Sequence, residues 1–152
     1  MGSGLGGHAV GRVRAVRNSI GNNEITGGIL VIDDEPVLRL TFRYLLEDEG
    51  FRVWTARDGR EGMDLYASMH PDLVITDMVM PKFNGSETIQ RLRACKPELP
   101  IIAMSAAMTE SDMERPLDEG PFCCVRKPID GALLIDLVRA ILEPQPNVPA
   151  GA

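Results

Sequence analysis

The sequence lacks any apolar run near the roughly 20 residues of a membrane-spanning helix, so we expect a soluble protein. Its three cysteines, Cys95, Cys123 and Cys124, have no metal-ligand spacing and no secretory signal before them. This odd set argues against a disulfide scaffold and favours the reducing cytoplasm. Positive charge is also scarce, because 16 Lys and Arg stand against 22 Asp and Glu, for a net charge of -6. Such an acidic chain argues against direct nucleic-acid binding.

The length of 152 residues suits one domain with tails. Residues 1–28 are rich in Gly and Asn, and we interpret them as a flexible leader or an artificial extension. Residues 143–152 carry three prolines and are predicted to be a disordered tail. The folded domain is therefore expected at residues 29–142, and the tail after it is too short to form a second domain.

Short apolar runs alternate with stretches of helical period along the middle of the chain. The apolar runs lie at 29–32, 52–56, 72–76, 100–105 and 122–125, and the helical stretches at 36–49, 59–68, 86–94 and 130–142. A further helix is expected in the polar stretch 108–121, where Pro116 would shorten or kink it. Continuous apolar strands joined by helices predict an α/β fold, a five-stranded parallel sheet with helices on both faces.

Polar side chains follow the ends of several predicted strands. Asp33 and Asp34 come after the first strand, Asp77 after the third, Ser105 ends the fourth, and Lys127 follows the fifth. Ligands of such sheets bind beyond the carboxyl ends of the strands, where the strand order reverses. We therefore expect all five side chains to meet at one edge of the sheet.

The three carboxylates would repel each other, each pair by about 4 kcal/mol at about 4 Å and an effective dielectric constant near 20. A hard cation such as Mg²⁺ fits best among them, because it takes one or two carboxylates and leaves room for water and phosphate oxygens. Lys127 adds a fixed positive charge, and Ser105 adds a hydroxyl donor. Together these groups predict a pocket for a phosphoryl group.

Four motifs in order carry a resemblance to a known family: "VIDDEP", "DLVITDMVMPKFNG", "IIAMSA" and "RKPID". Each motif alone is weak, but all four at this spacing are specific. Over residues 29–142 the chain resembles a receiver domain of two-component response regulators, of the stand-alone chemotaxis-regulator type. The resemblance implies a flavodoxin-like sheet with strand order 2-1-3-4-5, which is a common strand order of doubly wound α/β folds.

The resemblance also implies roles for the site residues. Asp77 would be the nucleophile that accepts a phosphoryl group from a phosphohistidine of a sensor histidine kinase or a phosphotransfer protein. Asp34 and Asp77 would bind Mg²⁺ with the backbone carbonyl of Val79, while Asp33 would act through water. Lys127 and Ser105 would hold the phosphoryl oxygens.

Two further positions follow from the same resemblance. Pro128 would follow a cis peptide bond, and Gly85 would permit the turn after "MPKFN". The phosphorylated domain would signal through altered binding to a downstream protein, without inserting into a membrane. It would not be an enzyme, since it assists only its own phosphorylation and dephosphorylation.

The sequence departs from the family pattern at several positions. Cys124 stands where receivers often place Tyr or Phe, and we expect that Phe122 does not replace that ring. Adjacent cysteines in an apolar strand are more often small buried hydrophobic residues than redox or metal sites. Val79 and Ala107 cannot orient a water molecule with their side chains, which predicts a long-lived aspartyl phosphate.

Two other functions stay open on the sequence alone. The first is a receiver-like scaffold that acts without phosphorylation, which Cys124 and Pro116 favour to some extent. The second is an aspartate-nucleophile phosphatase of the haloacid dehalogenase type. That chemistry needs a second acid two residues after the nucleophile, where this chain has Val79.

Overall fold

The computed structural model describes residues 15–17, 24–79, 85–106 and 122–142. The strands are β1 Ala15–Arg17, β2 Glu24–Thr26, β3 Gly28–Ile32, β4 Arg52–Ala56, β5 Leu73–Asp77, β6 Ile101–Ser105 and β7 Phe122–Arg126. The helices are α2 Pro36–Asp48, α3 Gly59–Met69, α4 Gly85–Cys95 and α6 Gly131–Leu142. Within these ranges, no helix has the length and apolar character to cross a membrane.

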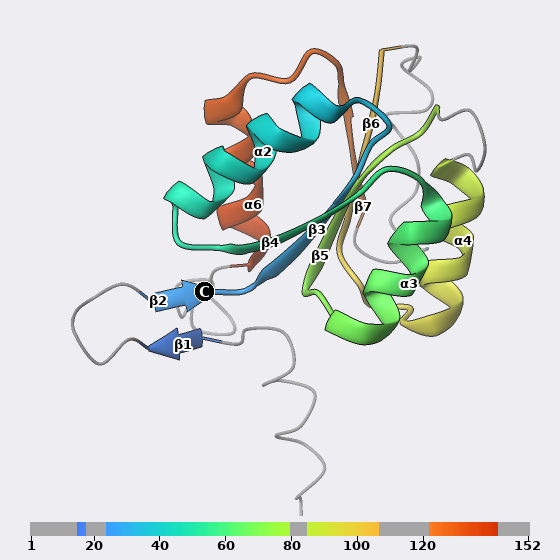
Figure 1. Ribbon diagram of the computed structural model, residues 1–152, viewed down its shortest axis with the longest axis horizontal. Coiled ribbons are helices and arrows are strands. Elements are labelled where there is room, and N and C mark those ends of the chain that lie inside the picture. The colour runs from blue at the N-terminus through green and yellow to red at the C-terminus, as the bar shows by residue number, and fades with distance from the viewer. Residues whose placement is uncertain (1–14, 18–23, 80–84, 107–121, 143–152) are drawn as a thin grey trace, which may run out of the picture.

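Five of the strands form one sheet in the order β4-β3-β5-β6-β7, and every neighbouring pair is parallel. When the five strands of this sheet are numbered along the chain, this is the predicted order 2-1-3-4-5 of an α/β fold, so the expectation from the sequence is confirmed. Strand order reverses around β3, which lies between β4 and β5 (Figure 1). Strands β3, β5 and β6 are fully buried, as their continuous apolar sequences predict.

Helices cover both faces of this sheet, with α2 and α6 on one face and α3 and α4 on the other (Figure 1). Each face has its own apolar core. Phe42 and Leu46 of α2 and Leu134 and Val138 of α6 pack on the first face. Ile89 and Leu92 of α4 pack on the second. These buried positions repeat at helical spacing, which explains why each helix lies flat on the sheet.

Local sequence determines where the helices begin and end. Pro36 lies in the first turn of α2, where its missing N–H leaves no bond unmade. Gly50 follows α2 with a φ of 98°, a conformation that glycine adopts without strain. The Asp58 side chain accepts a hydrogen bond from the Glu61 N–H at 2.9 Å and caps α3. The observed helices match the predicted ranges to within one residue at each end.

Two structural features lie at or before residue 29, the expected start of the domain. Strand β3 begins at Gly28, one residue before the expected start of the domain, because its N–H is held by the side chain of buried Asp72 at 2.9 Å. Strands β1 and β2 pair with each other as a separate antiparallel sheet within the segment interpreted as a flexible leader. The expected helix at 108–121 and its Pro116 lie outside the described residues.

Candidate functional site

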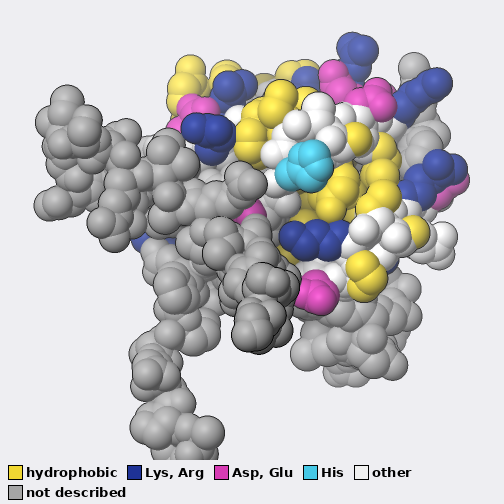
Figure 2. Space-filling model, turned by 90° about the horizontal axis from the view of Figure 1, so that it is seen from below, with side chains coloured by type: hydrophobic (Ala, Val, Ile, Leu, Met, Phe, Trp, Pro, Cys, Tyr) yellow, Lys and Arg dark blue, Asp and Glu magenta, His cyan; other side chains and the backbone are white. Residues whose placement is uncertain are grey.

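The carboxyl ends of β3 and β5 bring three aspartates together at one edge of the sheet. Asp33 and Asp77 are buried, and Asp34 is exposed. One carboxylate oxygen from each of the three lies within 4.8 Å of the others. The convergence predicted for these side chains is therefore observed. At the opposite end of the molecule, acidic side chains are scattered among hydrophobic and basic ones (Figure 2).

The side chain of Lys127, which directly follows β7, reaches the aspartates. Its Nζ lies 2.8 Å from Asp33 Oδ2 and 3.1 Å from Asp77 Oδ2. A third carboxylate, that of Glu35, lies 3.5 Å from the same Nζ. The lysine side chain is only 14% exposed, so these contacts are partly shielded from solvent. One ammonium group thus balances part of the negative charge that the carboxylates bring together.

Backbone groups hold the carboxylates in place. The Val79 N–H donates to Asp77 Oδ1 at 3.1 Å, and the Glu35 N–H donates to Asp33 Oδ1 at 2.8 Å. From α2, Arg39 Nη1 donates to the carbonyl oxygen of Asp33 at 2.7 Å. Asp77 is therefore held at both oxygens, by Lys127 on one and by the Val79 N–H on the other.

Burial and charge shift the proton affinities of two of these groups. Burial raises the pKa of Asp33, and the contact with Lys127 and the hydrogen bond from the Glu35 N–H only partly offset it. For Lys127, burial alone would lower the pKa, but the close contacts with the negative charges of Asp33 and Asp77 outweigh it, so the pKa is raised. Lys127 is therefore charged at neutral pH, whereas burial disfavours the ionised form of Asp33.

The donor set fits a hard divalent cation. Asp33 Oδ2 is fully buried and accepts no well-aligned hydrogen bond, although it forms an ion pair with Lys127. Buried polar atoms usually have hydrogen-bond partners, so such an oxygen has lone pairs left for a metal or a metal-bound water. Carboxylate oxygens are ligands that Mg²⁺ prefers, and one or two of these three would be enough to bind it directly.

The remaining predicted site residues lie around this cluster. Ser105 is buried at the end of β6, and its carbonyl accepts a hydrogen bond from the Lys127 N–H at 3.0 Å. The Lys127–Pro128 peptide bond is cis, as expected. Val79 is 64% exposed, so its side chain does not pack into the core.

Gly85 begins α4, and the structure gives this glycine a steric requirement beyond the expected turn, which itself lies outside the described residues. A Cβ atom at this position would lie 2.2 Å from the carbonyl oxygen of Asp77 and 2.6 Å from Met78 Cα. These contacts are with backbone, which cannot move aside cheaply. The glycine is therefore required by the close approach of α4 to the end of β5, in addition to any role in the turn.

Two of the expectations about departures from the family pattern can be placed on the structure. Cys123 and Cys124 are half-buried and pack against the first and the second core, respectively, and burial raises the pKa of the Cys123 thiol. Both positions agree with the interpretation as small apolar residues. The side chain of Phe122 and the whole of Ala107 lie outside the described residues.

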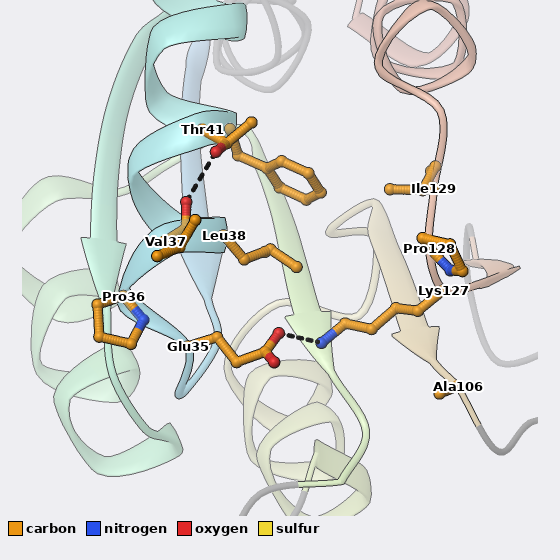
Figure 3. Close-up of a pocket in the computed structure, with 10 residues that line it drawn as sticks. Glu35, Pro36, Val37, Leu38, Thr41, Ala106, Lys127, Pro128 and Ile129 are labelled. Carbon is orange, nitrogen blue, oxygen red and sulfur yellow. Dashed lines mark hydrogen bonds and ion pairs between the residues drawn. The ribbon is translucent and has the colours of Figure 1, made fainter.

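The sequence interpretation missed Glu35 and Arg39 as members of the site. Glu35 lines a pocket of about 730 Å³ between the start of α2 and the segment after β7, with Lys127 and several apolar residues. Figure 3 shows Glu35 and Lys127 meeting across this pocket. The signal for Glu35 was its place directly after the two aspartates. Arg39 lies four residues further along α2, one helical turn from Glu35, and faces the same strand end.

Comparisons with known proteins agree with this geometry. Residues 29–139 match the response regulator receiver domain family. The response regulator MprA of Mycolicibacterium vanbaalenii is 38% identical over 115 residues, and that of Mycobacterium avium is 35% identical over the same length. Each alignment covers 76% of this chain and 50% of the relative, so the chain spans about half the length of these curated relatives.

Solved structures show the same fold. The chemotaxis protein CheY4 of Vibrio cholerae aligns with a TM-score of 0.70 and 25% identity, over 76% of this chain and 98% of that one. A response regulator receiver domain protein from Clostridium thermocellum aligns with a TM-score of 0.66 and 32% identity, over 75% and 93%. Fold, site geometry and sequence similarity thus lead to one conclusion: the chain belongs to the receiver domain family of two-component response regulators.

Proposed function

We propose that this receiver domain accepts a phosphoryl group on Asp77 from a phosphohistidine of a histidine kinase or a phosphotransfer protein. The observation that carries the proposal is the arrangement around Asp77, a buried carboxylate beside two further aspartates and in contact with the ammonium group of Lys127. We place the reaction in the cytoplasm, in keeping with the reducing environment that the cysteines favour.

In this reaction an oxygen of the Asp77 carboxylate forms a bond to phosphorus while the P–N bond of the phosphohistidine breaks. The donor imidazole leaves with the electron pair of that bond and takes up a proton. Lys127 and the Ser105 hydroxyl stabilise the charge on the phosphoryl oxygens. The Val79 N–H fixes the orientation of the Asp77 carboxylate, since it already donates to Oδ1.

Asp34, Asp77 and the carbonyl of Val79 would hold Mg²⁺, with Asp33 binding it through water. When bound, the ion would neutralise part of the charge that gathers among the carboxylates and the phosphoryl oxygens. The buried Asp33 Oδ2, which lacks a well-aligned hydrogen bond, supports this assignment.

Phosphorylation would then shift the balance between two surface conformations and change the affinity for a downstream protein. Such couplings typically amount to about 1–3 kcal/mol and are reciprocal, so the partner would also bias phosphorylation. A scaffold that works without phosphorylation is the second candidate, because Cys124 takes the place of an aromatic ring that receivers often carry. Beryllofluoride, a phosphoryl mimic, separates the two, since it would change partner affinity only in the first case.

The proposal is tested by incubating the protein with acetyl phosphate and measuring its intact mass. We expect the mass of one phosphoryl group to be added when Mg²⁺ is present and not when EDTA replaces it. Asp77→Asn should stay unmodified, whereas Asp136→Asn, an exposed position on α6, should react as the wild type does. A wild-type protein that stays unmodified with donor and Mg²⁺ in excess would overturn the proposal.

A further inference from the structure

Lys127 occupies oxygens that the proposed metal site also needs. Its Nζ lies 2.8 Å from Asp33 Oδ2 and 3.1 Å from Asp77 Oδ2, and both residues belong to the cluster of three aspartates. An ammonium group and a divalent cation repel each other strongly at such short range. Entry of Mg²⁺ therefore requires the ammonium group to move away from at least one of these carboxylates.

Glu35 offers a place for the displaced ammonium group. Its Oε1 lies 3.5 Å from Lys127 Nζ, and among the described residues it is the only carboxylate outside the aspartate cluster that forms an ion pair with this lysine. Its side chain is 61% exposed and can reorient, while its backbone N–H stays bonded to Asp33. Figure 3 shows the two side chains reaching toward each other from opposite sides of the pocket.

We propose that Glu35 is a positioning residue that receives the Lys127 ammonium group when Mg²⁺ enters the aspartate cluster. The inference rests on the proposed function, because it concerns the metal site of that reaction. The exchange keeps Lys127 beside the cluster, where its charge is needed for the incoming phosphoryl oxygens. It also stabilises the metal-bound protein, because the displaced lysine keeps Glu35 as an acidic partner.

A double-mutant cycle on Mg²⁺ affinity tests this exchange. The dissociation constant is measured by titration calorimetry at fixed ionic strength for wild type, Glu35→Gln, Lys127→Met and the double variant. We expect Glu35→Gln to weaken Mg²⁺ binding about twofold to fivefold, the range of a partly exposed ion pair. In the Lys127→Met background, where no ammonium group needs a new partner, the same substitution should have almost no effect.

The control is Glu47→Gln, which removes one charge from an exposed position further along the same helix. It should leave Mg²⁺ affinity unchanged, and Glu35→Asp should restore part of the affinity that Glu35→Gln loses. If Glu35→Gln lowers Mg²⁺ affinity equally in both backgrounds, Glu35 acts on the ion directly and the inference is wrong. The inference is also wrong if Glu35→Gln does not lower Mg²⁺ affinity in the wild-type background. Neither result would contradict the proposed phosphorylation of Asp77. A wild-type protein that binds no Mg²⁺ would overturn the proposed metal site as well.

Discussion

At the scale of single residues, Asp33 shows a conflict between stability and the proposed function. Burial raises the pKa of its carboxyl above the ordinary value of 3.8, although the contact with Lys127 offsets part of the shift. The folded protein therefore holds this proton more tightly than the unfolded chain. As pH rises from 3.8 to the raised pKa, the unfolded chain loses this proton before the folded protein does. The contribution of Asp33 to the free energy of unfolding therefore falls over this pH range.

We therefore expect Asp33→Asn to raise the free energy of unfolding at pH 7 by about 1 kcal/mol when EDTA is present. The substituted side chain still offers an acceptor to the Glu35 N–H, and Lys127 keeps Asp77 as a partner. Chemical denaturation at several pH values measures the effect, and the gain over wild type should shrink as pH falls toward 3.8.

The control for this prediction is Asp34→Asn, which changes an exposed carboxylate of the same cluster. It should change stability by less than about 0.5 kcal/mol in EDTA. With Mg²⁺ in excess, the wild type alone should gain stability from the bound ion. A destabilised Asp33→Asn variant at pH 7 in EDTA would show that the contact with Lys127 outweighs burial.

Gly85 is the second residue with a specific physical requirement. Gly85→Ala would place a Cβ atom against the backbone of Asp77 and Met78, at 2.2 Å and 2.6 Å. Because backbone must shift to relieve the clash, we expect a loss of about 2–3 kcal/mol in unfolding free energy. A displaced Asp77 should also slow phosphorylation by acetyl phosphate, which intact mass against time would show.

Gly131→Ala is the matched variant, since Gly131 also begins a helix. Its Cβ atom would approach Leu45 Cδ1 at 3.0 Å, the far end of a flexible side chain. We expect it to cost less than about 1 kcal/mol and to leave phosphorylation unchanged. Equal costs at the two glycines would show that the contact with the end of β5 is not what matters at Gly85.

At the scale of elements, the two helices that follow β3 and β4 begin in different ways. Helix α3 has a side-chain cap, because Asp58 accepts from the Glu61 N–H, whereas α2 begins at Pro36 with no side-chain cap bond from Glu35. Asp58→Ala should therefore lower the unfolding free energy by about 1 kcal/mol, as measured by chemical denaturation. Asp64→Ala, an exposed position inside α3, should cause no such loss, and equal losses would contradict the capping role.

The elements also show what the sequence could and could not predict. The buried strands were predictable, because four or five consecutive apolar residues have few other stable places in a domain of this size. The pairing of β1 with β2 was not, since three-residue segments are too short for an alternating apolar pattern to be recognised. The left-handed conformation of His70, which ends α3 with a φ of 53°, also had no signal beyond the proline that follows it.

At the scale of the whole molecule, the meeting of the site residues was predictable because it follows mainly from the topology of the sheet. A parallel sheet directs the ends of β3, β5, β6 and β7 to one edge, so Asp33, Asp77 and Lys127 meet although they are far apart in sequence. The contact of Glu35 with Lys127 could not be predicted in the same way. It depends on how two side chains lie across a pocket, which strand order does not determine.

The central claim is that the acidic cluster makes Asp77 the phosphoryl acceptor, and the most direct test is to map the modified residue. After reaction with acetyl phosphate and Mg²⁺, borohydride reduces an aspartyl phosphate to homoserine, which peptide mass spectrometry locates. We predict homoserine at position 77 alone, and none when EDTA replaces Mg²⁺. Homoserine at another aspartate, or at none while donor and Mg²⁺ are in excess, would contradict the account.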